Sequence, residues 1–178
     1  PPLFMLVLLA AGYAWGHLRL ERAGTSYVDG VRLRIVQPNI PQKEKWKPEN
    51  RGAIFQRYLQ VSRDKTLLGD IGAVTHLVWP ESAVPFLLTE TPEALDAVAE
   101  LVPDGAVFIT GAARGVRDAA ASGGLRVYNS LYVMSDEAKV LSVYDKTHLV
   151  PFGEYLPFPD ALESIGLSRL TRNRSRFA

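Results

Sequence analysis

Residues 144–158 place a lysine and a glutamate in a largely apolar segment that two prolines stiffen. The run reads YDKTHLVPFGEYLPF, and its two charges of interest are Lys146 and Glu154. Pro151 and Pro157 restrict the backbone of this segment. Because an unpaired charge is costly to bury, a lysine and a glutamate in such a segment should be paired or used. The pattern predicts a rigid loop that directs both charges toward one point.

A second motif places a carboxylate directly after a predicted strand. Residues 77–79 (LVW) are typical of a buried strand, and Pro80 ends it. Glu81 then falls in the first turn after the strand, on the kind of loop that often carries catalytic groups. Taken alone, Glu81 has a second interpretation as a carboxylate that stabilises a helix N-terminus. Together with Lys146 and Glu154, it indicates a functional site.

Composition excludes several classes of site. The chain has 178 residues and a net charge of +1, so no general attraction to nucleic acid is implied. It contains no cysteine, which excludes disulfides, thiolate metal sites and a cysteine nucleophile within this sequence. His17, His76 and His148 are scattered and lack metal-ligand spacing. We therefore expect neither a metal nor a cofactor.

The beginning of the sequence differs from the rest. Residues 3–15 are almost wholly apolar, Tyr13 and Trp15 suit a membrane interface, and Arg19 follows. The run is shorter than the ~20 apolar residues of a membrane span. It also lacks the basic first region of a signal peptide. We expect residues 1–20 to be the end of a transmembrane helix, and the alternative is a core helix of a soluble domain.

The remaining sequence predicts one domain at 31–178 after a polar linker at 21–30. We expect strands at 31–37, 76–79, 106–111, 127–134 and 139–144, helices at 49–68, 91–101 and 159–166, and loops at 38–47 and 114–124. Strands that alternate with helices and then form a hairpin indicate an α/β sandwich, in which helices cover a central sheet.

These motifs together resemble a known family. Residues 79–82 (WPES) and 144–149 (YDKTHL) are similar to the first two elements of the nitrilase, or carbon–nitrogen (CN) hydrolase, superfamily, whose catalytic triad is Glu-Lys-Cys. Residues 150–157 (VPFGEYLP), with 36–42 (VQPNIPQ) and Trp46, resemble more specifically the bacterial apolipoprotein N-acyltransferases. The resemblance covers nearly the whole chain. It implies a nitrilase-like α-β-β-α sandwich, incomplete here, preceded by the end of a transmembrane helix.

The resemblance also implies catalytic roles for three residues. Glu81 resembles the general base of the family, and Lys146 resembles the lysine that stabilises the oxyanion. Glu154 resembles a second glutamate that supports the site. The cysteine nucleophile of the family lies beyond the lysine, further along than this sequence reaches. We therefore expect a sequence that is truncated at both ends.

Further positions match the family less specifically. Trp46 matches a loop tryptophan that governs substrate access, and a surface anchor is an equally open interpretation of it. We expect Tyr155 to contribute to substrate binding. Tyr128 and Asn129 match a family position, and we expect them to serve packing and hydrogen bonding near the sheet.

By this resemblance, the intact protein transfers an acyl chain from a phospholipid to the N-terminal diacylglyceryl-cysteine of an apolipoprotein. The reaction passes through a thioester on the cysteine that this sequence lacks. The resemblance implies a multi-pass protein of the bacterial inner membrane, with its catalytic domain on the periplasmic side. Its partners would be the phospholipid, the apolipoprotein and the membrane, and this chain alone is expected to be inactive.

Two other hypotheses remain open at this point. A soluble nitrilase-type amidase would share Glu81 and Lys146, but it would explain neither the apolar start nor the run at 150–157. A pseudoenzyme or binding module that has lost its nucleophile is a non-enzymatic alternative.

Overall fold

A computed structural model describes residues 2–66, 69–120 and 124–151, together with residues 154, 158 and 164. The chain divides into two compact units, Pro1–Val31 and Arg32–Ala178. The two units are described separately below.

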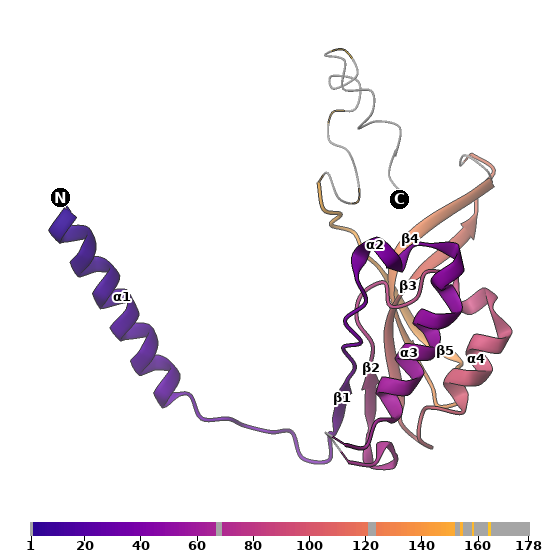
Figure 1. Ribbon diagram of the computed structural model, residues 1–178, viewed down its shortest axis with the longest axis horizontal. Coiled ribbons are helices and arrows are strands. Elements are labelled where there is room, and N and C mark those ends of the chain that lie inside the picture. Colours follow the sequence, from indigo (N-terminus) through magenta and orange to yellow (C-terminus); the bar gives the residue numbers. More distant parts are fainter. Residues whose placement is uncertain are drawn as a thin grey trace. The chain divides into compact units, whose positions relative to one another are not determined.

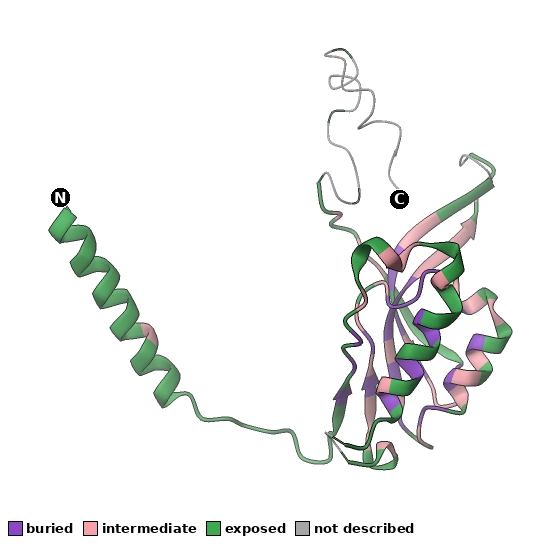
Figure 2. Cartoon of the chain, in the orientation of Figure 1, coloured by how far each residue is buried: buried purple, intermediate pink, exposed green. Residues whose placement is uncertain are grey.

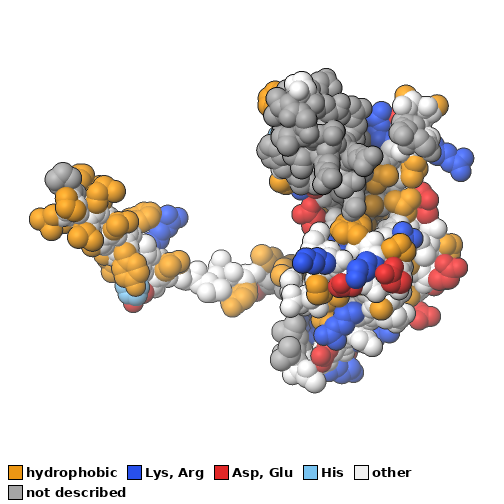
Figure 3. Space-filling view, turned by 45° about the horizontal axis from the view of Figure 1, so that its top comes forward, with side chains coloured by type: hydrophobic (Ala, Val, Ile, Leu, Met, Phe, Trp, Pro, Cys, Tyr) orange, Lys and Arg blue, Asp and Glu red, His pale blue; other side chains and the backbone are white. Residues whose placement is uncertain are grey.

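The first unit consists of one long apolar helix, α1 (Pro2–Arg22), followed by an extended segment (Figure 1). No residue of α1 is buried, and apolar side chains cover it along its length (Figures 2 and 3). At ~1.5 Å per residue, a helix of this length spans about 30 Å, which is the thickness of the hydrocarbon core of a bilayer. The structure thus confirms the predicted apolar helix, which by length and composition is able to cross a membrane.

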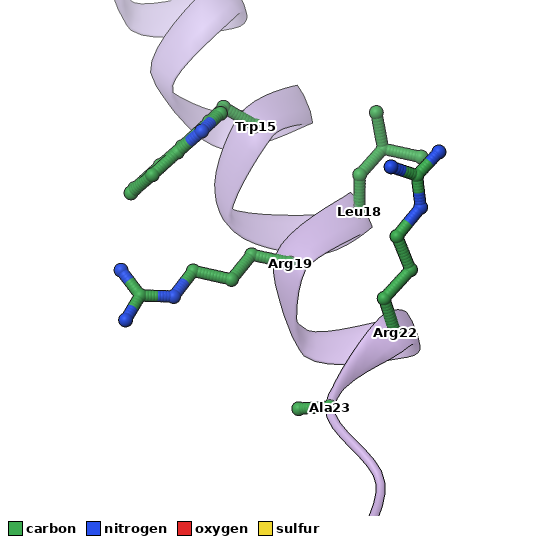
Figure 4. Close-up of a pocket in the computed structure, with 5 residues that line it drawn as sticks. All are labelled: Trp15, Leu18, Arg19, Arg22 and Ala23. Carbon is green, nitrogen blue, oxygen red and sulfur yellow. The ribbon is translucent and has the colours of Figure 1, made fainter.

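The last turns of α1 combine an aromatic ring with two cations (Figure 4). They border a shallow surface hollow lined by Trp15, Leu18, Arg19, Arg22 and Ala23. The guanidinium carbon of Arg19 lies 5.3 Å from the centre of the Trp15 ring. Tryptophan and arginine at the end of an apolar helix are typical of a segment that reaches a membrane–water interface.

The second unit is built on a mixed five-stranded sheet with the strand order β1-β2-β3-β4-β5 (Figure 1). The strands are β1 (Leu33–Ile35), β2 (His76–Val78), β3 (Val107–Arg117), β4 (Leu125–Met134) and β5 (Val140–Asp145). The first three strands pair in parallel, and the last two add antiparallel to β3. As a result, β2, β3 and β5 all run in one direction and end at the same edge of the sheet.

Two helices, α3 (Arg51–Arg63) and α4 (Pro92–Ala99), cover one face of this sheet (Figure 1). The short helix α2 (Gln42–Lys45) and the 3-10 helices at Pro48–Asn50, Ile71–Ala73 and Leu88–Glu90 lie in the connecting segments. Trp79 is at the centre of the core, with ring centroids 4.8 Å from Tyr58 of α3 and 4.9 Å from Phe108 of β3. Val98 of α4 is fully buried in the same apolar cluster. Burial of these rings therefore fixes α3 and α4 against the sheet.

On the opposite face of the sheet, several large apolar side chains are exposed. Side chains alternate between the two faces of a strand, so the neighbours of buried Arg34 on β1 point to this second face. Leu33 and Ile35 are exposed there, as are Leu131 on β4 and Tyr144 on β5. The described residues thus form one sheet with one helical layer. The α/β class is confirmed, and the observed layers match one half of the predicted α-β-β-α sandwich.

Several predicted boundaries differ from the structure. Residues 114–117 belong to β3 and not to a loop, because β3 and β4 pair along a long hairpin from Phe108–Met134 to Arg117–Leu125. Helix α3 ends at Arg63, before the predicted end at 68, and α2 lies inside the predicted loop at 38–47. The helix predicted at 159–166 lies outside the described residues, apart from Ser164.

Candidate active site

Glu81 sits on a tight turn that is fastened to β3. Gly111 of β3 donates its backbone N–H to the carbonyl of Pro80 at 3.3 Å and accepts the N–H of Ala83 at 2.7 Å. Ser82 adopts a positive φ of 49°, which turns the chain sharply between these two bonds. A Cβ atom on Gly111 would lie 2.6 Å from the Cα atom of Glu81. Glycine is therefore required at residue 111 for this close approach.

Lys146 directly follows β5 and continues its pairing with β4. Its backbone N–H donates to the carbonyl of Asn129 at 2.8 Å. Ser130 pairs with Asp145, so the preceding Asn129 and the following Lys146 point to the face opposite the helices. The carboxyl ends of β2 and β5 thus bring Glu81 and Lys146 to the same edge of the sheet.

Lys146, Glu81 and Glu154 form one ionic cluster. The Nζ atom of Lys146 lies 3.1 Å from Oε1 of Glu81 and 3.0 Å from Oε2 of Glu154. Asn129 donates its side-chain amide to both glutamates, at 2.6 Å to Glu81 Oε1 and 2.8 Å to Glu154 Oε1. The structure therefore brings together the three residues that the sequence singled out, although Glu81 and Lys146 are 65 residues apart.

The two glutamates differ in how firmly they are held. Glu154 accepts the backbone N–H of Val150 at 2.8 Å, and its side chain is only 14% exposed. The side chain of Glu81 is 63% exposed. Glu154 is thus an anchored anion, whereas Glu81 is the carboxylate that an incoming molecule is able to reach.

Local contacts favour the charged forms of Lys146 and Glu154. The hydrogen bonds from Lys146 to Glu154 and to Glu81 raise the pKa of Lys146 above its ordinary value. Burial alone would raise the pKa of Glu154, but hydrogen bonds from Val150, Lys146 and Asn129 lower it overall. An accessible carboxylate beside a fixed ammonium is able to accept a proton from a nucleophile, while the ammonium stabilises an oxyanion.

A second lysine connects the cluster to the loop that carries Trp46. The Nζ atom of Lys45 lies 3.5 Å from the backbone carbonyl oxygen of Glu81 and 5.9 Å from the centre of the Trp46 ring. Burial lowers the pKa of Lys45, although the charge of Glu81 opposes this effect. Trp46 therefore directly follows Lys45, which contacts the Glu81 turn. Tyr155, the other residue predicted to bind substrate, lies outside the described residues.

Asn129 is the site residue that sequence reasoning underestimated. It was expected to serve packing and hydrogen bonding, but it contacts both carboxylates and is only 4% exposed. An amide side chain in the middle of a predicted strand was the available signal. Across the described part of the chain, no cluster of three His, Asp or Glu side chains is arranged to hold a metal ion.

The sequence was compared with curated proteins. It is 42% identical over 178 residues to an apolipoprotein N-acyltransferase of Rhodopseudomonas palustris, covering 99% of this chain and 33% of the relative. A protein of the same name from Bradyrhizobium diazoefficiens is 40% identical, with the same coverage. The chain is homologous to the apolipoprotein N-acyltransferases. It spans about a third of the length of these relatives, and no family model matches it.

Carbon–nitrogen hydrolases and amidases are among the solved structures that align with part of this chain. A carbon–nitrogen hydrolase from Helicobacter pylori aligns with a TM-score of 0.44 at 15% identity, covering 67% of this chain and 40% of that structure. An amidase from Nesterenkonia aligns with a TM-score of 0.42 at 11% identity, covering 72% of this chain and 48% of that structure.

Proposed function

We propose that this chain contributes the glutamate–lysine part of an N-acyltransferase active site. The reaction would move an acyl chain from a phospholipid to the N-terminal amine of a diacylglyceryl-cysteine on an apolipoprotein. The observation that carries the proposal is the position of the Lys146 ammonium between Glu81 and Glu154. Homologues that are 40–42% identical over nearly the whole chain carry the name of this activity.

The exposures of the two glutamates support different roles for them. Glu81 takes the proton of a cysteine thiol, and the resulting thiolate attacks the acyl ester of the phospholipid. Lys146 stabilises the negative oxygen of the tetrahedral intermediate. Glu81 returns the proton to the departing lysophospholipid alkoxide, which leaves a thioester. Glu154, which is anchored and poorly exposed, holds Lys146 in place.

The second half-reaction uses the same groups. The amine of the diacylglyceryl-cysteine attacks the thioester carbonyl, Lys146 again stabilises the oxyanion, and Glu81 takes a proton from the attacking nitrogen. Collapse of the intermediate transfers the acyl group to nitrogen and releases the thiolate, which regains its proton from Glu81. Because this sequence contains no cysteine, the nucleophile would come from outside it.

Residues near the cluster would guide the lipid substrates. We assign Trp46 to substrate access, because its neighbour Lys45 contacts the Glu81 turn. Tyr155 is assigned to substrate binding on the sequence resemblance alone.

The location of the enzyme follows from its substrates. Both are lipids, and α1 is an exposed apolar helix able to cross a bilayer. We propose that the intact protein is a multi-pass protein of the bacterial inner membrane, with the catalytic domain on the periplasmic side.

A soluble amidase is the second candidate function, because the same cluster suits amide hydrolysis. The exposed apolar surface of α1 favours the membrane enzyme.

A chimera tests the proposal. This sequence would replace the aligned third of the Rhodopseudomonas palustris relative, and N-acylation of a diacylglyceryl-lipopeptide would be measured with a labelled phospholipid. We expect activity, and we expect a loss of about 100-fold or more when Glu81→Gln or Lys146→Met removes the base or the ammonium. Glu137→Gln is the matched control, since Glu137 pairs with Lys139 on an exposed turn away from the cluster.

Two results would overturn the proposal. The first is a folded chimera that hydrolyses small amides in water but transfers no acyl chain. The second is full acyl transfer by the Glu81→Gln variant.

A further inference from the structure

A second ionic group lies on the helix-covered face of the sheet, directly behind the Glu81–Lys146–Glu154 cluster. Arg114 of β3 donates from Nε to Oδ1 of Asp145 at 2.8 Å, and a terminal guanidinium nitrogen contacts Oδ2 of the same carboxylate. Ser130 of β4 donates its hydroxyl to Oδ1 of Asp145 at 2.6 Å. The guanidinium carbon of Arg114 also lies 4.9 Å from the centre of the Tyr128 ring. We call these four residues the Arg114 clamp.

The Arg114 clamp and the cluster use adjacent residues of the same two strands. Asp145 directly precedes Lys146, and Ser130 directly follows Asn129. Ser130 and Asp145 are register partners, so the clamp residues face the helices while Asn129 and Lys146 face the other way. A slip of one residue between β4 and β5 would exchange the two faces and remove Lys146 from the glutamates.

The register needs support at this end of β5. The β4–β5 pairing is irregular between Val133 and Met134, near the start of β5. At the other end, the regular pairs stop at Ser130 and Asp145, and the backbone bond from Lys146 to Asn129 follows. A bidentate arginine–carboxylate pair adds geometric specificity that a single backbone bond lacks.

We propose that Arg114 and Asp145 are positioning residues, which fix the register of β5 so that Lys146 lies between Glu81 and Glu154. The inference concerns the site of the proposed function, but its test measures Lys146 in this protein and requires no acyl transfer. The positioning role of Arg114 and Asp145 can therefore fail its test while the proposed acyl-transfer function stands, and the reverse.

The test is the pKa of Lys146 in Arg114→Met. It would be followed by NMR in protein labelled with [ε-13C]lysine and kept in detergent, with the resonance assigned by its loss in Lys146→Arg. Removing a cation and leaving Asp145 uncompensated would by charge alone raise the pKa of Lys146. Loss of register would lower it, because Lys146 would leave the two carboxylates. We expect the pKa of Lys146 to fall. We also expect Lys146 to be acetylated roughly threefold faster at a pH below its pKa, because each unit of decrease in the pKa raises the neutral fraction of the amine tenfold.

Two further variants keep the test decisive. Ser130→Ala changes no charge, and we expect a smaller fall in the pKa of Lys146 with the fold retained. It stands in for Arg114→Met if that variant does not fold. The control is Arg126→Met, which breaks an ion pair with Asp118 on the same β3–β4 hairpin and should leave Lys146 unchanged. A pKa of Lys146 that rises or stays constant in folded Arg114→Met, or stays constant in Ser130→Ala, contradicts the proposal.

Discussion

Gly111 lies so close to Glu81 that a Cβ atom at residue 111 would fall 2.6 Å from the Cα atom of Glu81. The same atom would lie 2.8 Å from the backbone nitrogen of Ser82. Real Cβ atoms do not approach backbone this closely, so the turn that presents Glu81 depends on the absence of a side chain on β3.

Gly111→Ala should therefore displace the Glu81 turn. We expect a loss of about 1–3 kcal/mol in the free energy of unfolding, because the backbone must shift to relieve the overlap. Urea denaturation followed by tryptophan fluorescence measures this change. Gly52→Ala is the control, since Gly52 is an open position on α3 with no atom within 4 Å of its added Cβ. It should stabilise the protein by about 0.5–1 kcal/mol, and equal effects of the two variants would contradict the prediction.

Asn129→Asp should destabilise the protein, although the side chains of asparagine and aspartate have nearly the same shape. The variant removes the amide that donates to Glu81 and Glu154 and places a third carboxylate beside them. We expect a loss of about 1–3 kcal/mol at pH 7. Asn39→Asp adds the same charge at an exposed position and serves as the control. Equal unfolding free energies for the two variants would show that the bridging amide has no structural importance.

The protein should lose stability in acid through Asp145 and Glu154. Hydrogen bonds from Arg114 lower the pKa of Asp145, and the contacts of Glu154 lower its pKa as well. Since the folded-state pKa values lie below the unfolded values of about 3.9 and 4.3, this stability is present above pH ~4 and is lost as the pH falls through the folded values. Unfolding free energies measured between pH 7 and pH 2 should show the decrease. Asp145→Asn should reduce the decrease of the unfolding free energy with falling pH. The control Asp29→Asn, at an exposed position, should leave that decrease unchanged.

Arg34 should be important for the fold and irrelevant to the chemistry. It is 2% exposed and donates to the carbonyls of Ser62 at 2.7 Å and Gly69 at 2.8 Å, which close the C-terminal end of α3. Arg34→Met leaves the buried carbonyl of Ser62 and the carbonyl of Gly69 without their donor, so we expect a loss of about 2–3 kcal/mol. Exposed Arg32 offers the comparison: Arg32→Met should change the midpoint of thermal unfolding little. A similar melting temperature for both variants would refute the role assigned to Arg34.

This chain alone should form no acyl-enzyme. It contains Glu81 and Lys146 but no cysteine to carry a thioester. Incubation of the purified protein with a phospholipid labelled in its acyl chain, followed by mass spectrometry, should detect no covalent adduct. An acyl group found on any side chain, removable by hydroxylamine, would identify a different nucleophile.

Much of the sheet was predictable from local sequence. Buried strands such as β2 and the hairpin of β4 and β5 have continuous or alternating apolar patterns, which indicate strands without further context. The extension of β3 through Arg114 to Arg117 was not predicted, because one valine among glycine and arginine gives little strand signal alone. It is the long antiparallel pairing with β4 that makes these residues a strand.

The sequence by itself determined which charges to consider together as a candidate site. Glu81, Lys146 and Glu154 stand out because each is a charged residue in a proline-bounded, apolar context, where an unused charge would be costly. Only the tertiary structure decided how they meet. Asn129, Gly111 and the Arg114 clamp act across strands that are far apart in sequence, and their roles depend on strand register and on which face each side chain occupies. Those properties arise from pairing between distant segments, and no local pattern encodes them.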